Sequence, residues 1–99
     1  MPSYKFMPVS LSLNGQPCLV VGGGAVALRK IESLMDYGGE ITVIAPKVQD
    51  KIKYFGETGK VKLEHREYRI GEAAKFKYVI SASDDMDVNR QVSEDCREG

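Results

Sequence analysis

PCLVVGGGAVALRK, residues 17–30, is the stretch of sequence around which the rest of this chain is arranged. An apolar run over residues 18–21 leads directly into three consecutive glycines, and a helical pattern of apolar residues begins at Ala25. The run is short enough for a buried strand, and the helical pattern continues through Ala27, Ile31, Leu34 and Met35. The stretch therefore predicts a strand, a tight turn and a helix.

The small residues of this turn fit the G-x-G-x-x-G/A fingerprint of dinucleotide-binding folds, at Gly22, Gly24 and Ala27. Gly22 permits the sharp turn out of the strand, and Gly24, which has no Cβ, lets the backbone approach a pyrophosphate. The unpaired N–H groups at the start of the helix would hold that charge, and Ala27 would let the helix pack closely on the strand. A purely structural turn is the alternative, but the strand-to-helix context favours a nucleotide site.

Composition indicates a single domain over residues 1–99, with 42% hydrophobic residues. Because Lys+Arg and Asp+Glu both number 14, no net charge attracts nucleic acid or an anionic membrane, and we expect neither as a partner. No apolar run approaches the roughly 18 residues of a spanning helix, and the N-terminus has no signal pattern. We therefore expect a soluble, cytoplasmic protein.

The cysteines and the histidine predict no disulfide and no metal site. Cys18 lies in a predicted buried strand and Cys96 near the end of a predicted helix, so both are expected to be free thiols. His65, between Glu64 and Arg66 in a predicted edge strand, is expected to be solvated. No Cys/His cluster has the spacing of zinc ligands.

The remaining periodicity predicts an alternation of strands and helices. After the first strand we expect a helix over 25–37, a strand over 40–45, helical spacing over 48–55 and a strand over 60–64 at the rim of the sheet. A turn of helix at 71–75 and a strand over 76–82, covered on both faces, should follow. The last helix should have a buried face that holds Val88, Val92 and Cys96. Residues 9–13 of the lead-in are expected to form a short half-buried strand, and Asn14-Gly15 a hairpin turn.

This order predicts an α/β fold, a Rossmann-like doubly wound parallel sheet with strand order 3-2-1-4. Right-handed crossovers bring the ends of the first and fourth strands to one crevice. We therefore expect the glycine turn, residues 45–47 and residues 83–85 to line one cleft.

Several stretches together resemble the N-terminal domain of siroheme synthase and the precorrin-2 dehydrogenases. These are FMPVSLSLNGQPCLVVGGG at 6–24, VVGGGAVALRKIESLMDYGGEITVIAP at 20–46 and VISASDDMDVNRQV at 79–92, so the similarity covers almost the whole chain. The resemblance implies NAD-dependent dehydrogenation of the tetrapyrrole precorrin-2 to sirohydrochlorin in a homodimeric enzyme. Bifunctional members of the family also insert ferrous iron.

The resemblance also implies the positions of the NAD contacts. They fall on Gly22, Gly23, Gly24, Ala25 and Val26 around the pyrophosphate, on Pro46 and Lys47 near the adenosine, and on Ser83 near the nicotinamide. The acidic residue that usually binds the ribose at the end of the second strand is absent, because Ala45, Pro46 and Lys47 stand there. Lys47 could accept a 2′-phosphate, whereas the resemblance favours NAD, and Lys47 is alternatively a solvated residue before the next helix.

The catalytic carboxylate of this family lies in an Asn-Val-Val-Asp stretch after a fifth strand. This sequence ends at Gly99, before that strand, so the carboxylate is expected beyond Gly99 and no catalytic residue is assigned within the chain. We expect a fragment that lacks the C-terminal half for dimerisation and substrate binding. Such a fragment would be inactive on its own.

Other polar residues near the predicted cleft have less specific interpretations. Asp84 and Asp85 are paired carboxylates, but capping the last helix is their expected role. Arg29 and Lys30 are expected to be solvated rather than bound to a phosphate, and Asn89 and Arg90 are interpreted as structural.

Two other function classes remain open. A regulatory Rossmann module would bind NAD(H) without chemistry, although the ALRK and VNRQV stretches argue against it. A methyltransferase also begins with a glycine-rich turn, but it normally carries an acidic residue at the end of the second strand.

Overall fold

The structure, a computed structural model, describes residues 15–98 of the chain. The predicted strand over 9–13, the turn at Asn14 and the final residue Gly99 lie outside the described residues. The elements in order are β1 (Pro17–Val21), α1 (Ala25–Asp36), β2 (Glu40–Ile44), α2 (Asp50–Glu57), β3 (Lys62–Glu64), the 3-10 helix η1 (Glu72–Lys75), β4 (Tyr78–Ser81) and α3 (Met86–Glu98). No helix among these is both long and apolar enough to pass through a lipid bilayer.

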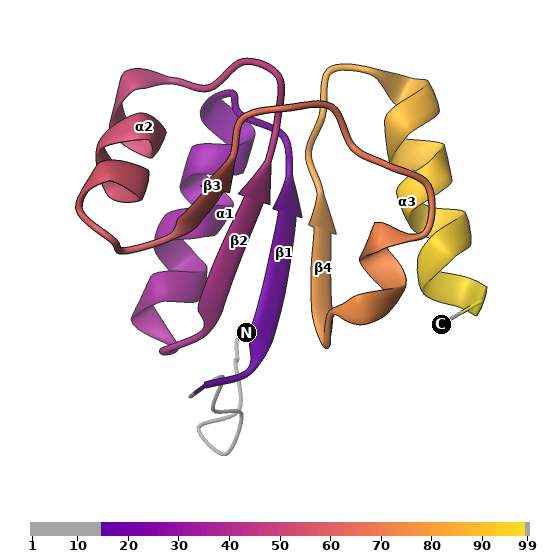
Figure 1. Ribbon diagram of the computed structural model, residues 1–99, viewed down its shortest axis with the longest axis horizontal. Coiled ribbons are helices and arrows are strands. Elements are labelled where there is room, and N and C mark those ends of the chain that lie inside the picture. Colours follow the sequence, from indigo (N-terminus) through magenta and orange to yellow (C-terminus); the bar gives the residue numbers. More distant parts are fainter. Residues whose placement is uncertain (1–14, 99) are drawn as a thin grey trace, which may run out of the picture.

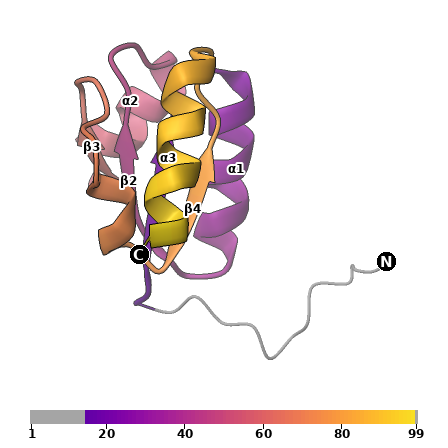
Figure 2. The ribbon, with the colours of Figure 1, turned by 90° about the vertical axis from the view of Figure 1, so that its right-hand side faces the viewer.

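The four strands form one parallel sheet in the order β3-β2-β1-β4, as the sequence predicted (Figure 1). One face packs against α1 and α2, through Ile31 and Ile52 among others. The other face packs against η1 and α3, through Ala73 and Val92. Figure 2 shows α3 in front of the edge strand β4, with η1 beside the C-terminal end of α3. The domain is thus two layers of helix around one sheet.

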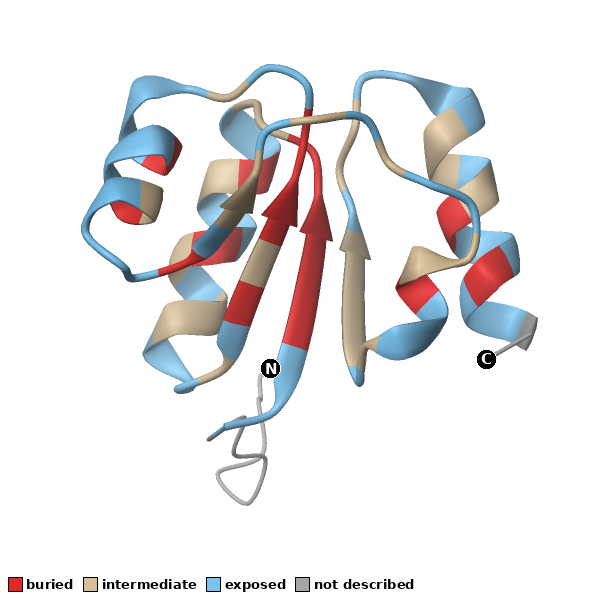
Figure 3. Ribbon diagram, viewed as in Figure 1, coloured by how far each residue is buried: buried red, intermediate tan, exposed pale blue. Residues whose placement is uncertain are grey.

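β1 is the buried centre of the sheet, because it pairs with β2 on one side and with β4 on the other. Cys18, Leu19 and Val20 are 0% exposed, and alternate residues enter the two hydrophobic clusters. In Figure 3 the buried colouring accordingly covers β1 beyond its exposed N-terminal end, and most of β2. A near-continuous apolar run is what a central parallel strand requires.

The fourth strand is covered on both faces, as predicted, because Tyr78 and Ile80 pack against one hydrophobic cluster and Val79 against the other, but the cover is incomplete. Tyr78, Val79 and Ile80 are only half-buried, and Figure 3 shows β4 in the intermediate colour. The reason is position, since among the described residues β4 pairs with β1 alone and forms an edge of the sheet. The strand is also shorter than predicted, ending at Ser81.

A glycine marks the C-terminal end of α1, as predicted, but not that of α2. α1 ends as predicted, because Gly38 adopts a φ of 80° and donates its N–H to the Met35 carbonyl. α2 instead continues through Gly56 to Glu57, beyond the helical spacing over 48–55 that the sequence predicted. A Cβ at Gly56 would lie 3.0 Å from Cβ of Leu63, so glycine allows α2 to pack closely on β3.

The buried face of α3 differs from the prediction at Cys96. Val92 is buried and Val88 half-buried, but Cys96 is exposed and Asp95 is 6% exposed in its place. At about 100° per residue, a position eight residues after Val88 is rotated by roughly 80° away from it, whereas a position seven residues after it is rotated by only about 20°. Asp95 therefore lies on the buried stripe, and Cys96 does not.

Candidate functional site

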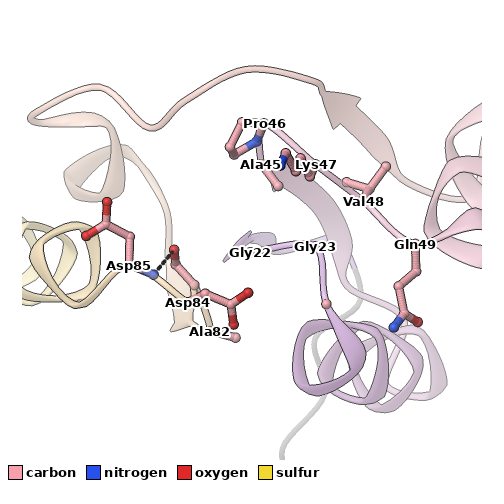
Figure 4. A pocket seen from close by; sticks show the side chains of 12 residues that line it. Gly22, Gly23, Ala45, Pro46, Lys47, Val48, Gln49, Ala82, Asp84 and Asp85 are labelled. Atoms are coloured by element: carbon pink, nitrogen blue, oxygen red, sulfur yellow. Dashed lines mark hydrogen bonds between the residues drawn. The ribbon is translucent and has the colours of Figure 1, made fainter.

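A cleft of about 430 Å³ opens at the carboxyl ends of β1, β2 and β4. Its walls come from three segments that are far apart in sequence: the glycine turn at 22–24, residues 45–49 and residues 82–85. Figure 4 shows Gly22 and Gly23 between these two outer segments. The three segments are those that the predicted topology placed together, and the volume is in the range of small-molecule sites, roughly 300–1,000 Å³.

Gly22 and Gly23 are glycines because neighbouring backbone passes too close for a side chain. Gly22 has a φ of 140°, and a Cβ there would lie 2.4 Å from the carbonyl oxygen of Ala82. A Cβ on Gly23 would lie 2.0 Å from the carbonyl oxygen of Lys47. Both contacts are between parts of this chain, so these two glycines are required by the fold itself.

Gly24 is different, because no atom of the described residues beyond Gly24 and its two chain neighbours lies within 4 Å of the position of its missing Cβ. Its φ of −92° and ψ of −163° are open to any residue. Gly24 is the N-cap of α1, accepts the N–H of Leu28 at 2.9 Å, and provides no side-chain cap. Neither the packing nor the backbone requires glycine here, and the cleft keeps open space beside the free N–H groups of the first turn.

The segment after β2 forms the wall on the α2 side. Gln49 donates its backbone N–H to the Gly23 carbonyl at 2.9 Å and so fixes this segment against the turn. Pro46 and Lys47, both exposed, line the cleft as predicted from the sequence. Val48 and Gln49 also line it, although nothing in their sequence pattern indicated so. Gln49 is the N-cap of α2 and makes no side-chain cap, so its amide is available to a ligand.

The segment after β4 forms the opposite wall. The N–H of Ala82 donates to the Val21 carbonyl at 2.8 Å, which holds the segment on β1. Ser83 lines the cleft, and its hydroxyl oxygen accepts the N–H of Asp85 at 3.0 Å, the dashed line in Figure 4. Asp85 Oδ1 accepts the N–H of Asp87 at 2.9 Å. Asp85 therefore caps α3, as predicted, and its carboxylate is engaged in that role.

Several candidate residues lie outside this cleft. Ala25 and Val26 are exposed on the first turn of α1, and neither residue lines the cavity. His65 is exposed, and so are Arg29 and Lys30 on α1. Arg90 lies 3.3 Å from Asp87 in an exposed ion pair. Within residues 15–98, no group of three His, Cys, Asp or Glu side chains is arranged to hold a metal ion.

A second cavity of about 180 Å³ adjoins the cleft on the α3 side of the sheet, next to Tyr68. The Tyr68 hydroxyl donates to Asp95, and it accepts the N–H of Ala73 at 2.9 Å. Desolvation by burial and the hydrogen bond to Asp95 raise the pKa of Tyr68 to about 12, although the Ala73 N–H acts in the opposite direction. Hydrogen bonds from the Tyr68 hydroxyl and the Gly71 N–H lower the pKa of Asp95. The cluster fixes the loop before η1 against α3.

The two cysteines are free thiols within the described residues, as predicted. Cys18 is fully buried in β1, and this burial raises the pKa of its thiol. A buried, protonated thiol is a poor nucleophile, so Cys18 acts as a core residue.

The expectation that the catalytic carboxylate lies beyond Gly99 stays a prediction. Gly99 is outside the described residues, and the last described element, α3, ends at Glu98. The walls of the cleft between residues 22 and 85 are therefore the part of the site that the structure describes.

Comparison with known proteins places this geometry among nucleotide-binding domains. The family described as "Putative NAD(P)-binding" matches residues 9–99. The siroheme synthase of Nitrosococcus oceani is 39% identical over 88 residues, which are 89% of this chain and 19% of that protein. The siroheme synthase of Pseudomonas aeruginosa strain PAO1 is 40% identical over 88 residues, with the same coverage. The chain thus spans about a fifth of the length of the curated relatives it matches.

A solved structure shares the fold. "SirC, precorrin-2 dehydrogenase" superposes with a TM-score of 0.80 and 31% sequence identity, over 88% of this chain and 44% of that one. The parallel sheet with its flanking helices is therefore an arrangement already known from this structure.

Proposed function

The chain belongs to the family described as "Putative NAD(P)-binding", and from this membership and the geometry of the cleft we propose that it binds NAD as the cofactor domain of a precorrin-2 dehydrogenase. The names of the similar proteins, siroheme synthase and precorrin-2 dehydrogenase, support this reaction. The proposed substrate is precorrin-2 and the product sirohydrochlorin. For the whole protein, the proposal also includes iron insertion, homodimer formation and a cytoplasmic location.

The open space at Gly24 is the observation that carries the proposal. Gly22 and Gly23 are explained by contacts within the chain, whereas the missing side chain of Gly24 is explained by a ligand that approaches the backbone. A pyrophosphate at this point would accept hydrogen bonds from the first turn of α1, where the helix dipole favours negative charge.

The rest of the cofactor would lie across the cleft. In sheets of this kind the adenosine lies over the second strand, which here ends at Pro46 and Lys47. The nicotinamide would then lie over β4, next to Ser83. Bound NAD supplies the hydride acceptor, and the protein supplies position and electrostatics.

The reaction also releases a proton, which requires a general base. Asp84 and Asp85 are the carboxylates that line the cleft, and Asp85 is engaged as the cap of α3. We propose that the general base is supplied from beyond Gly99, outside this sequence. The second candidate is a regulatory module that binds NAD(H) without chemistry. It is favoured by the same observation, because Asp85 caps α3 and is not free to act as a base.

Binding is tested by titration calorimetry of the chain with NAD⁺ and with NADP⁺. We expect saturable heat for the wild type and at least about tenfold weaker binding for Gly24→Val, because the new side chain would occupy the proposed pyrophosphate position. The free energy of unfolding of this variant should change by about 1 kcal/mol or less, since the added atoms meet open space.

Ser33→Val is the matched control, because Ser33 is exposed on the same helix, away from the cleft. Absence of heat for the wild type with both nucleotides, or wild-type affinity in Gly24→Val, would contradict the binding proposal. The reaction is tested with the whole protein in which this chain occurs, as an NAD-dependent appearance of sirohydrochlorin absorbance. Binding without that absorbance would favour the regulatory module.

A further inference from the structure

Asn89, on the first turns of α3, binds the backbone of the wall that follows β4. Its Nδ2 donates to the Ser83 carbonyl oxygen at 2.9 Å, and its Oδ1 accepts the Ser83 N–H at 3.1 Å. Oδ1 also accepts a hydrogen bond from the Ser81 hydroxyl. One side chain thus satisfies both backbone polar groups of Ser83.

The segment is held from the opposite side as well. The Ala82 N–H donates to Val21, and the Ala82 carbonyl lies against Gly22, where a Cβ would come within 2.4 Å. Ala82 and Ser83 are therefore fixed between β1 and α3. Because both backbone polar groups of Ser83 are paired, its backbone is held at the edge of the cleft.

The hydroxyl of Ser83 keeps one donor for a ligand. Its oxygen accepts the N–H of Asp85 at 3.0 Å, and its hydrogen makes no bond to any other described residue. A hydroxyl can accept and donate at the same time, so the contact with Asp85 orients the group without using its hydrogen. The cleft thus has a fixed donor on the β4 side.

We propose that Asn89 is a positioning residue for the nicotinamide half of the cofactor, and that it acts through Ser83. The inference rests on the proposed function, because a dinucleotide bound across this sheet would have its nicotinamide over β4. Asn89 orders the Ser83 wall before the ligand arrives. The ligand then does not have to supply the free energy of ordering that wall.

The test compares NAD⁺ with ADP-ribose, which has the adenosine and pyrophosphate but no nicotinamide. We expect Asn89→Ala to bind NAD⁺ about fivefold to tenfold more weakly, the equivalent of losing one well-placed hydrogen bond. The same variant should bind ADP-ribose within about twofold of the wild type, because that ligand does not reach Ser83. A role confined to stabilising α3 would affect both ligands equally.

Gln91→Ala is the matched control, because it also removes an amide from α3, but one that bonds to Asp95 at 3.0 Å, away from the cleft. It should leave the affinities for both ligands unchanged. If Asn89→Ala does not fold, Asn89→Asp takes its place, since it keeps the two acceptor contacts and loses the donor to the Ser83 carbonyl.

The outcomes separate this inference from the function it rests on. Equal weakening of NAD⁺ and ADP-ribose, or no weakening of either, overturns the role of Asn89 while the wild type still binds NAD⁺. A wild type that binds neither ligand removes the proposed function, and the positioning role is removed with it.

Discussion

The three consecutive glycines of the turn have three different physical reasons. Gly22 needs a positive φ and lies against Ala82, Gly23 lies against the Lys47 carbonyl, and Gly24 faces open space. The sequence fingerprint treats such glycines as one motif, although only Gly24 is left unexplained by the fold. The distinction can be tested by stability alone, without any ligand.

Gly22→Ala should lower the free energy of unfolding by about 3 kcal/mol. Part of the loss is backbone strain at a φ of 140°, and part is the clash of the new methyl group with Ala82. Gly59→Ala is the control, because Gly59 has a φ of 80° but no atom within 4 Å of its missing Cβ. It should cost only about 1 kcal/mol in urea denaturation. Equal losses in the two variants would show that the clash is absent.

At the scale of elements, α3 is attached to the domain by polar contacts as well as by apolar ones. Asp95 accepts hydrogen bonds from Tyr68, from the Gly71 N–H and from Gln91. Glu72 accepts Arg66 Nη1 at 2.9 Å, and this guanidinium lowers the pKa of the Glu72 carboxyl. The loop between β3 and η1 is therefore held by charged hydrogen bonds on both sides.

Asp95→Asn should lower the melting temperature at pH 7, and more than Asp36→Asn, an exposed control on α1. The pKa of Asp95 lies below its ordinary value of 3.8 in the folded state, so the ionised carboxylate favours folding. This contribution is complete above the unfolded pKa and is lost as the pH falls through the folded pKa. The difference between wild type and Asp95→Asn should therefore shrink below about pH 4 in thermal melts recorded across that range.

Glu72 titrates in both proteins, so its effect cancels from this comparison. A difference that stays constant down to acidic pH would show that the Asp95 charge does not contribute.

These elements also show where prediction from sequence ends. Apolar periodicity and glycine punctuation predicted the strand order, the helices and the three walls of the cleft, because each leaves a repeating local pattern. Asp95 was missed because its partners Tyr68 and Gly71 lie 27 and 24 residues away in a loop without periodicity. The contacts of Asn89 with Ser83 and the position of Gln49 in the cleft were missed for the same reason, since a hydrogen bond to loop backbone leaves no pattern.

At the scale of the whole molecule, the sheet is buried at its centre and open at its edges. β1 pairs on both sides and is covered on both faces, whereas β3 and β4 each pair on one side within residues 15–98. This gradient predicts how the domain opens, because local openings begin where few buried contacts must be broken.

Native-state hydrogen exchange should therefore be slowest at the amides of residues 18–21 and fastest, among strands, at β3. Exchange of the β1 amides requires global unfolding, so their protection should equal the free energy of unfolding measured with denaturant. Slower exchange in α3 than in β1 would contradict a core centred on the sheet.

The contacts of Gly22 and Gly23 also set how this turn can evolve. Selection for a folded chain acts on these two codons in any descendant, even one that has lost its ligand. Selection no longer acts to keep glycine at position 24 once ligand binding is not needed. A descendant that keeps Gly22 and Gly23 but replaces Gly24 would thus be expected to keep the fold and to have lost ligand binding.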